Sequence, residues 1–86
     1  MDMTLMKAIR KEFHAKPKPF KDFNIGLVTY PNGLIMLRIY ENQIMGYNDD
    51  QRAIVMLYLQ DVRDRIKALG VDCNLEGVEG DAPTRR

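Results

Sequence analysis

The sequence predicts an α+β fold, in which one long helix packs across a small, three- to four-stranded and mainly antiparallel sheet. Three observations support this class. An 86-residue chain with 45% hydrophobic residues is long enough for one core and therefore for one domain. Two apolar segments flank the sequence Pro31-Asn32-Gly33, which is typical of a β-hairpin. Residues 49–69 contain no Gly or Pro and repeat apolar residues with helical spacing. The expected order is α-β-β-β-α-β, in a single domain of residues 1–76.

An N-terminal helix is expected in residues 1–15, because four apolar residues form a stripe along one side. These residues are Leu5, Met6, Ile9 and Phe13. Residues 16–22 begin with the sequence Lys-Pro-Lys-Pro, and proline favours an extended chain. This segment is therefore predicted to be a linker, and Phe20 and Phe23 are expected to anchor the chain to the core.

A β-meander is predicted in residues 24–47. Its first strands, Ile25–Tyr30 and Leu34–Tyr40, flank the Pro-Asn-Gly turn, where Gly33 is expected to take a left-handed conformation. A third strand is predicted at Gln43–Tyr47. Side chains alternate between the two faces of a strand, so one face of the second strand is expected to contact the core through Ile35, Leu37 and Ile39. The opposite face is only half polar and carries Leu34, Met36, Arg38 and Tyr40.

The long helix has clear signals at both ends. Asn48 and Gln51 have the spacing of a capping box, and the carboxylates of Asp49-Asp50 suit the positive end of the helix dipole. Gly70 is expected to end the helix at residue 69. Residues 71–76 then alternate apolar and polar side chains, which predicts a last strand. The remaining residues, 77–86, are polar and contain Gly and Pro, so a flexible tail is expected.

The long helix has more apolar surface than it needs to pack on a sheet. Each residue of a helix is rotated by about 100° from the one before it. This rotation brings five apolar residues into one narrow sector of the helix surface: Val55, Leu59, Val62, Ile66 and Leu69. Other apolar residues lie outside this sector: Ala53, Ile54, Met56 and Leu57. Burying a large apolar side chain contributes roughly 1.5–3 kcal/mol. We therefore expect either the N-terminal helix or a second copy of the chain to cover them.

The predicted interface for self-association, or for another protein partner, combines this helix surface with the apolar part of the second sheet face. Its residues are Ala53, Ile54, Met56, Leu57, Leu34, Met36 and Tyr40. One N-terminal helix can hardly cover both surfaces, which favours a homodimer.

A basic segment gives a second hypothesis. Residues 1–22 contain six Lys or Arg against three Asp or Glu, and nearby aromatic residues could stack on unpaired bases. The candidate nucleic-acid contacts are Lys7, Arg10, Lys11, Lys16, Lys18 and Lys21. The whole chain has a pI of about 7.9, however, and lacks the strongly basic character of most nucleic-acid binders. Binding to nucleic acid is therefore the alternative rather than the favoured function.

The sequence offers little for catalysis or metal binding. His14 and Cys73 are the only residues of their types, too few for a typical zinc site. Asp49-Asp50 fits a helix start better than a metal site, and no phosphate-binding glycine motif is present. We expect no enzyme activity, no metal and no cofactor.

The expected location is the cytoplasm, without membrane insertion. A single cysteine cannot form an internal disulfide, and the N-terminus lacks the pattern of a signal peptide. The longest apolar segment, Ala53–Leu59, has seven residues, whereas a membrane span needs roughly 20. The chain is thus expected to be a small interaction module that binds another macromolecule. Regulators, inhibitors and accessory proteins, including those of phages and mobile elements, fit this description.

Overall fold

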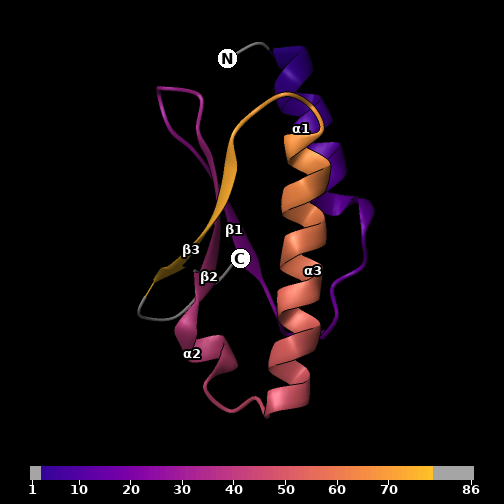
Figure 1. Cartoon of the computed structure of the whole chain (residues 1–86), viewed down its shortest axis with the longest axis vertical. Helices are drawn as coiled ribbons and strands as arrows, with labels where there is room; N and C mark the ends of the chain where they lie inside the picture. Colours follow the sequence, from indigo (N-terminus) through magenta and orange to yellow (C-terminus); the bar gives the residue numbers. More distant parts are fainter. Residues whose placement is uncertain (1–2, 79–86) are drawn as a thin grey trace.

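The computed structural model describes residues 3–78 and forms two layers, a sheet and a pair of helices (Figure 1). The elements in chain order are α1 (Met3–Ala15), β1 (Ile25–Thr29), β2 (Ile35–Tyr40), α2 (Glu41–Ile44), α3 (Asp49–Lys67) and β3 (Cys73–Val78). The predicted α+β class, with a small sheet and one long helix, is confirmed.

The sheet has three strands in the order β1-β2-β3. β1 pairs with β2 antiparallel, whereas β2 pairs with β3 parallel. The chain returns from the end of β2 to the start of β3 through α3, as parallel neighbours require a long connection. The sheet is therefore mixed, with β2 as its central strand.

The predicted third strand at Gln43–Tyr47 is wrong. The chain forms the short helix α2 there, followed by a turn in which the Tyr47 N–H donates to the Ile44 carbonyl at 3.0 Å. A meander strand would have to pair with β2 along the edge that β3 occupies. The order is consequently α-β-β-α-α-β, and Ile44 packs against the core from α2.

The hairpin turn is as predicted. Gly33 has a φ of +88°, a left-handed conformation that glycine adopts without steric cost. Its N–H donates to the Tyr30 carbonyl at 2.9 Å, and the Tyr30 N–H donates to the Leu34 carbonyl at 2.9 Å. The Asn32 side chain accepts a hydrogen bond from the Leu34 N–H at 3.1 Å. The turn thus aligns β1 and β2 through local contacts.

The capping box of α3 is confirmed. The Asn48 side chain accepts from the Gln51 N–H at 2.8 Å, and the Gln51 side chain accepts from the Asn48 N–H at 2.9 Å. Gly70 lies past the other end with a φ of +90°. The helix ends at Lys67, two residues earlier than predicted.

The last strand is shifted relative to its predicted position. β3 begins at Cys73 and includes Gly77 and Val78, which were expected in the tail. Pairing with β2 extends to Tyr40 opposite Val78, so these two residues belong to the sheet. The rest of the expected tail, residues 79–86, lies outside the described residues.

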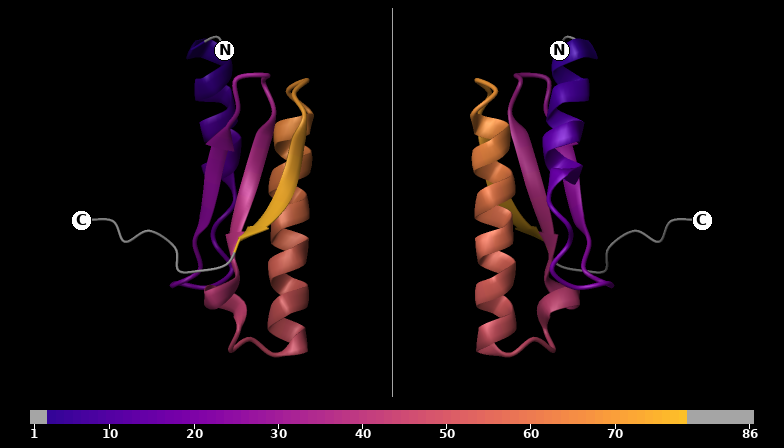
Figure 2. Two further views of the ribbon diagram at one scale, coloured as in Figure 1. Left: turned by 90° about the vertical axis from the view of Figure 1, so that its left-hand side faces the viewer. Right: turned by 90° about the vertical axis from the view of Figure 1, so that its right-hand side faces the viewer.

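The hydrophobic core lies between the sheet and the two long helices, which cover the same face of the sheet (Figure 2). Its fully buried side chains include the predicted Ile35 and Leu37 of β2. Phe23 is also fully buried and meets the Tyr58 ring with 6.2 Å between centroids. One assignment was wrong: Leu69, expected in the core, is 37% exposed, because α3 ends before it.

Candidate interaction surfaces

One face of the sheet is left open by the part of the chain that the structure describes (Figure 2). Both α1 and α3 lie on the other face. Strand register puts alternate residues of all three strands on the open face, where they form the open-face surface: Gly26, Val28, Met36, Arg38, Tyr40, Asn74, Glu76 and Val78. Six of these carry side chains larger than alanine that are only partly buried, and three of the six are apolar or aromatic residues of β1 and β2.

An ion pair lies at the centre of the open-face surface. The Arg38 Nε and Nη2 atoms donate to Glu76 Oε2 at 3.2 and 3.1 Å. The hydrogen bond from Arg38 to Glu76 raises the pKa of the guanidinium, and nearby Tyr30 acts in the same direction. The two charges cancel, so the surface combines apolar side chains with no net charge.

Gly26 lies close to the side chain of Tyr40 on this surface. A Cβ atom at Gly26 would lie 3.0 Å from the Tyr40 hydroxyl oxygen and 3.4 Å from Arg38 Cβ. The missing side chain therefore lets Tyr40 extend across β1. Sequence reasoning missed Gly26 and Val28, although the alternation of side chains along the first predicted strand could have found both.

The second candidate surface consists of exposed apolar residues in the first half of α3. Leu57 is 67% exposed, Ile54 46% and Met56 43%, and Ala53 is exposed as well. α1 does not cover them, because it packs beside the C-terminal half of α3 (Figure 1). We expected either the N-terminal helix or a second copy of the chain to cover this surface. The structure shows that the N-terminal helix does not.

The seven residues of the predicted interface do not form one surface. Met36 and Tyr40 belong to the open face of the sheet, and Leu34 lies at the hairpin turn that leads into β2. The four helix residues are exposed on α3, the helix that packs against the other face of the sheet (Figure 2). The structure thus separates the prediction into two surfaces on opposite sides of the molecule.

Charged residues surround the surface on α3. Asp61 Oδ2 accepts from Arg65 Nε at 3.1 Å and lies 3.2 Å from Lys16 Nζ. The hydrogen bonds from Arg65 and Lys16 lower the pKa of Asp61. These contacts tie the start of the linker to α3 and keep the α3 surface close to neutral.

Two of the six basic candidates for nucleic-acid contact already have a polar partner. Lys16 pairs with Asp61, and Lys18 Nζ donates to Asn24 Oδ1 at 2.9 Å. All six candidates are exposed, including the remaining four, Lys7, Arg10, Lys11 and Lys21. The aromatic residues expected beside them pack inward instead, since Phe13 and Phe20 contact the core.

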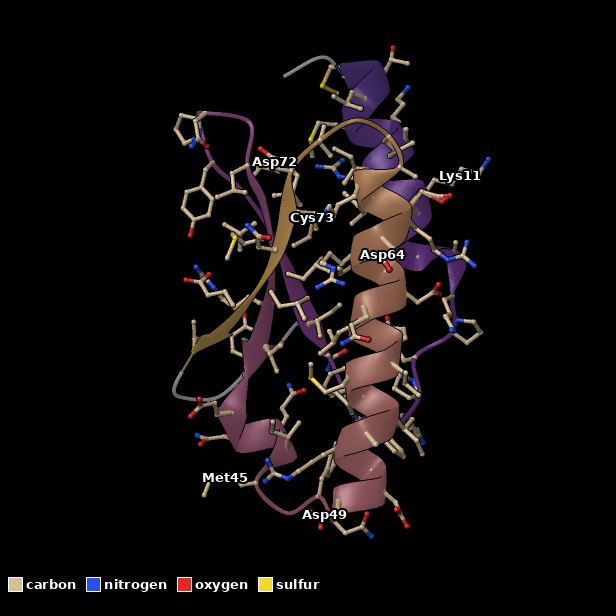
Figure 3. The ribbon with its side chains drawn as sticks, in the orientation of Figure 1. Lys11, Met45, Asp49, Asp64, Asp72 and Cys73 are labelled. Atoms are coloured by element: carbon tan, nitrogen blue, oxygen red, sulfur yellow. The ribbon has the colours of Figure 1, made fainter. Side chains whose placement is uncertain are left out.

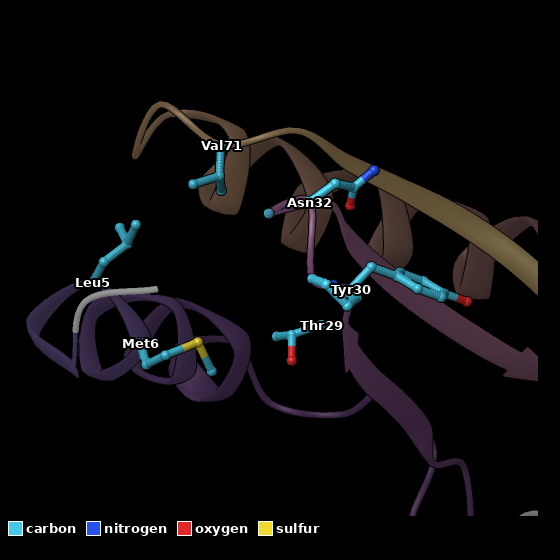
Figure 4. A pocket seen from close by; sticks show the side chains of 8 residues that line it. Leu5, Met6, Thr29, Tyr30, Asn32 and Val71 are labelled. Carbon is cyan, nitrogen blue, oxygen red and sulfur yellow. The ribbon is translucent and has the colours of Figure 1, made fainter.

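A hollow lies between the start of α1, the hairpin turn and the segment before β3 (Figure 4). It is lined by Leu5, Met6, Thr29, Tyr30, Pro31, Asn32, Gly33 and Val71. This lining offers the hydroxyl groups of Thr29 and Tyr30 but no carboxylate, imidazole, thiol or amine beside them that could act as their general base.

The single cysteine is buried in the core (Figure 3). Cys73 is 1% exposed, and burial raises the pKa of its thiol, although Arg63 and Lys67 oppose this effect. A buried, protonated thiol is a poor nucleophile. Within residues 3–78, no three His, Cys, Asp or Glu side chains gather in a way that could hold a metal ion.

Comparison with models of known protein families found no match. Searches of curated proteins and of solved structures likewise found no protein that matches this chain. Within the described residues, no helix has both the length and the apolar character needed to cross a membrane.

Proposed function

We propose that this protein is a non-enzymatic, cytoplasmic interaction module, which forms a homodimer and acts as a regulator, inhibitor or accessory protein by binding another macromolecule. The observation that carries the proposal is the open face of the sheet, which no residue in the described range covers. The cytoplasmic assignment is supported by the single cysteine, since secreted domains of this size commonly rely on disulfides.

The energetic argument rests on partly exposed apolar side chains. Val28, Met36 and Tyr40 lie together on the open face, where full burial of a large apolar side chain contributes roughly 1.5–3 kcal/mol. The Arg38–Glu76 pair is already formed, so a partner would not have to neutralise an isolated charge. Contiguous apolar patches on a surface commonly mark sites of protein interaction.

Two surfaces on opposite sides suggest more than one contact. A single twofold interface buries one patch of each copy, and α3 lies on the opposite side of the sheet from the open-face surface. At least one surface is therefore available for a macromolecule other than the second copy. This arrangement favours a dimer that holds a partner over a dimer with no further role.

Light scattering tests the homodimer. The chain has a mass of 10.0 kDa, and we expect about twice this mass at tens of micromolar, a range where interfaces of modest area associate. A mass that stays at the monomer value over this range would contradict the proposed homodimer.

Charge substitution tests which surface binds the partner. Met36→Glu on the open face should abolish the partner complexes that the wild type captures from native lysate, because the new charge would be buried unpaired. The double variant Ile54→Ser and Leu57→Ser tests the α3 surface, and should reduce capture if the partner binds there. Ala15→Glu is the control, since it adds one negative charge at an exposed position of α1. Capture that none of these variants changes would rule out both surfaces.

A further inference from the structure

We propose that a second copy of this chain pairs antiparallel with the free edge of β1, so that the homodimer contains one continuous six-stranded sheet. This inference rests on the proposed homodimer and specifies its interface. It is carried by the backbone groups of β1 rather than by side chains.

The hydrogen-bonding pattern identifies the free backbone groups. The Tyr30 N–H donates to the Leu34 carbonyl at 2.9 Å, and in an antiparallel pair alternate residues bond to the neighbouring strand. Val28 and Gly26 therefore bond to β2. The backbone N–H and C=O groups of Ile25, Leu27 and Thr29 point to the opposite edge, where no described residue offers a partner strand.

β1 lacks the features that usually protect a sheet edge. Its sequence, Ile-Gly-Leu-Val-Thr, contains no charged residue and no proline, and its register with β2 runs without a bulge. Natural edge strands commonly carry such features to prevent pairing with other chains. Their absence makes β1 suited to accept another strand.

The other edge of the sheet differs in charge. β3 contains Glu76 and directly follows Asp72. Charged side chains on or beside an edge strand commonly disfavour pairing with another chain, and Glu76 and Asp72 give the β3 edge two of them. Self-pairing is therefore expected at β1 and disfavoured at β3.

The symmetry of β1 defines the register of the pair. A twofold axis at Leu27 sets Leu27 opposite its copy and Ile25 opposite Thr29, so all three outward-facing residues form hydrogen bonds. Shifting the register by two residues leaves one of them unpaired. An antiparallel pair of identical strands also closes as a dimer, because both copies contribute the same patch.

The pairing has a consequence for the open-face surface. Strands added at β1 continue the sheet in the same layer, so the open faces of the two copies become neighbours on one side of the dimer. Val28 of one copy then lies next to Gly26 of the other. The partner macromolecule would meet a surface of twice the width that one copy offers.

Amide hydrogen exchange, followed by NMR, tests the inference on the unmodified protein. No residue in the described range accepts a hydrogen bond from the Leu27 or Thr29 amide within one copy, so both should exchange fast in the monomer. When about nine-tenths of the chains are dimeric, exchange limited to the monomer should slow about tenfold. Val28 is the internal control for the β1–β2 ladder, and Leu75 is the control for the edge of β3.

The outcomes separate this inference from the proposed function. A dimer in which Leu27 still exchanges fast, or in which Leu75 becomes protected instead, overturns the β1 interface while the homodimer stands. A chain that remains monomeric overturns both.

A variant pair gives a second test. Thr29→Pro removes an outward N–H without removing a bond to β2, and is expected to shift the protein to monomers. Thr29→Ala keeps the N–H and should remain dimeric. If Thr29→Pro fails to fold, the exchange of Leu27 in the wild type still decides the question. A folded Thr29→Pro protein that remains dimeric would overturn the inference.

Discussion

The two faces of the sheet have similar residues and opposite surroundings. Along β2, Ile35 and Leu37 are fully buried, whereas their neighbours Met36 and Tyr40 are partly exposed. All four are large and apolar or aromatic. Composition alone therefore does not explain why one face forms the core and the other remains open.

The difference comes from the connections. α3 links the parallel strands β2 and β3 and must cross one face of the sheet to do so. α1 then packs on that same face, where Ile9 is fully buried and Lys16 pairs with Asp61 of α3. A strand that is apolar on both faces can therefore contribute half of its residues to the core and leave the other half as an interaction surface.

The largest expected effect tests the comparison directly. Leu37→Ala removes a fully buried side chain and should lower the free energy of unfolding by about 2–5 kcal/mol. Met36→Ala, one residue away on the open face, should cost less than about 1 kcal/mol. Urea unfolding at a concentration low enough to keep the chain monomeric measures both. Equal losses would mean that the open face is as tightly packed as the core face.

A smaller effect is expected from the ion pair on the open face. In a double-mutant cycle with Arg38→Met and Glu76→Gln, the two residues should stabilise each other at low salt. The coupling should fall in about 1 M salt, because partly exposed charges are screened. Asp61 and Arg65 on α3 form the matched control pair, 3.1 Å apart. A coupling that salt does not reduce would argue that Arg38 and Glu76 are shielded from solvent.

The smallest expected effect concerns pH and the core face. Burial raises the pKa of Cys73 above its ordinary value of 9.0, so the folded protein holds the thiol proton more tightly than the unfolded chain. This stabilisation is fully present below pH 9 and is lost as the pH rises from there through the folded pKa. Free energies of unfolding measured between pH 8 and 10 should decrease as the pH rises.

The control for this effect is Cys73→Ala, in which the decrease should be smaller. Some decrease should remain at the upper end of the range, because burial also raises the pKa of Tyr58 above its ordinary value of 10.0. An unchanged slope in Cys73→Ala would show that the thiol is not its source.

Part of the candidate surface could be read from the sequence and part could not. Met36 and Tyr40 follow from alternation along a single strand, and Gly26 and Val28 could have been found in the same way. Glu76 and Val78 could not, because their position depends on the parallel register between β2 and β3. That register is set by contacts between residues far apart in the chain.

The sequence by itself determined the features that depend on a few neighbouring residues. These include the Pro31-Asn32-Gly33 turn and the Asn48–Gln51 capping box, because each is specified by local backbone geometry and short-range hydrogen bonds. Only the tertiary structure decided that Glu41–Ile44 is helical, that β3 pairs with β2, and that α1 leaves Leu57 exposed. Those outcomes depend on which surfaces compete for the same edge or face, and no single stretch of sequence contains that information.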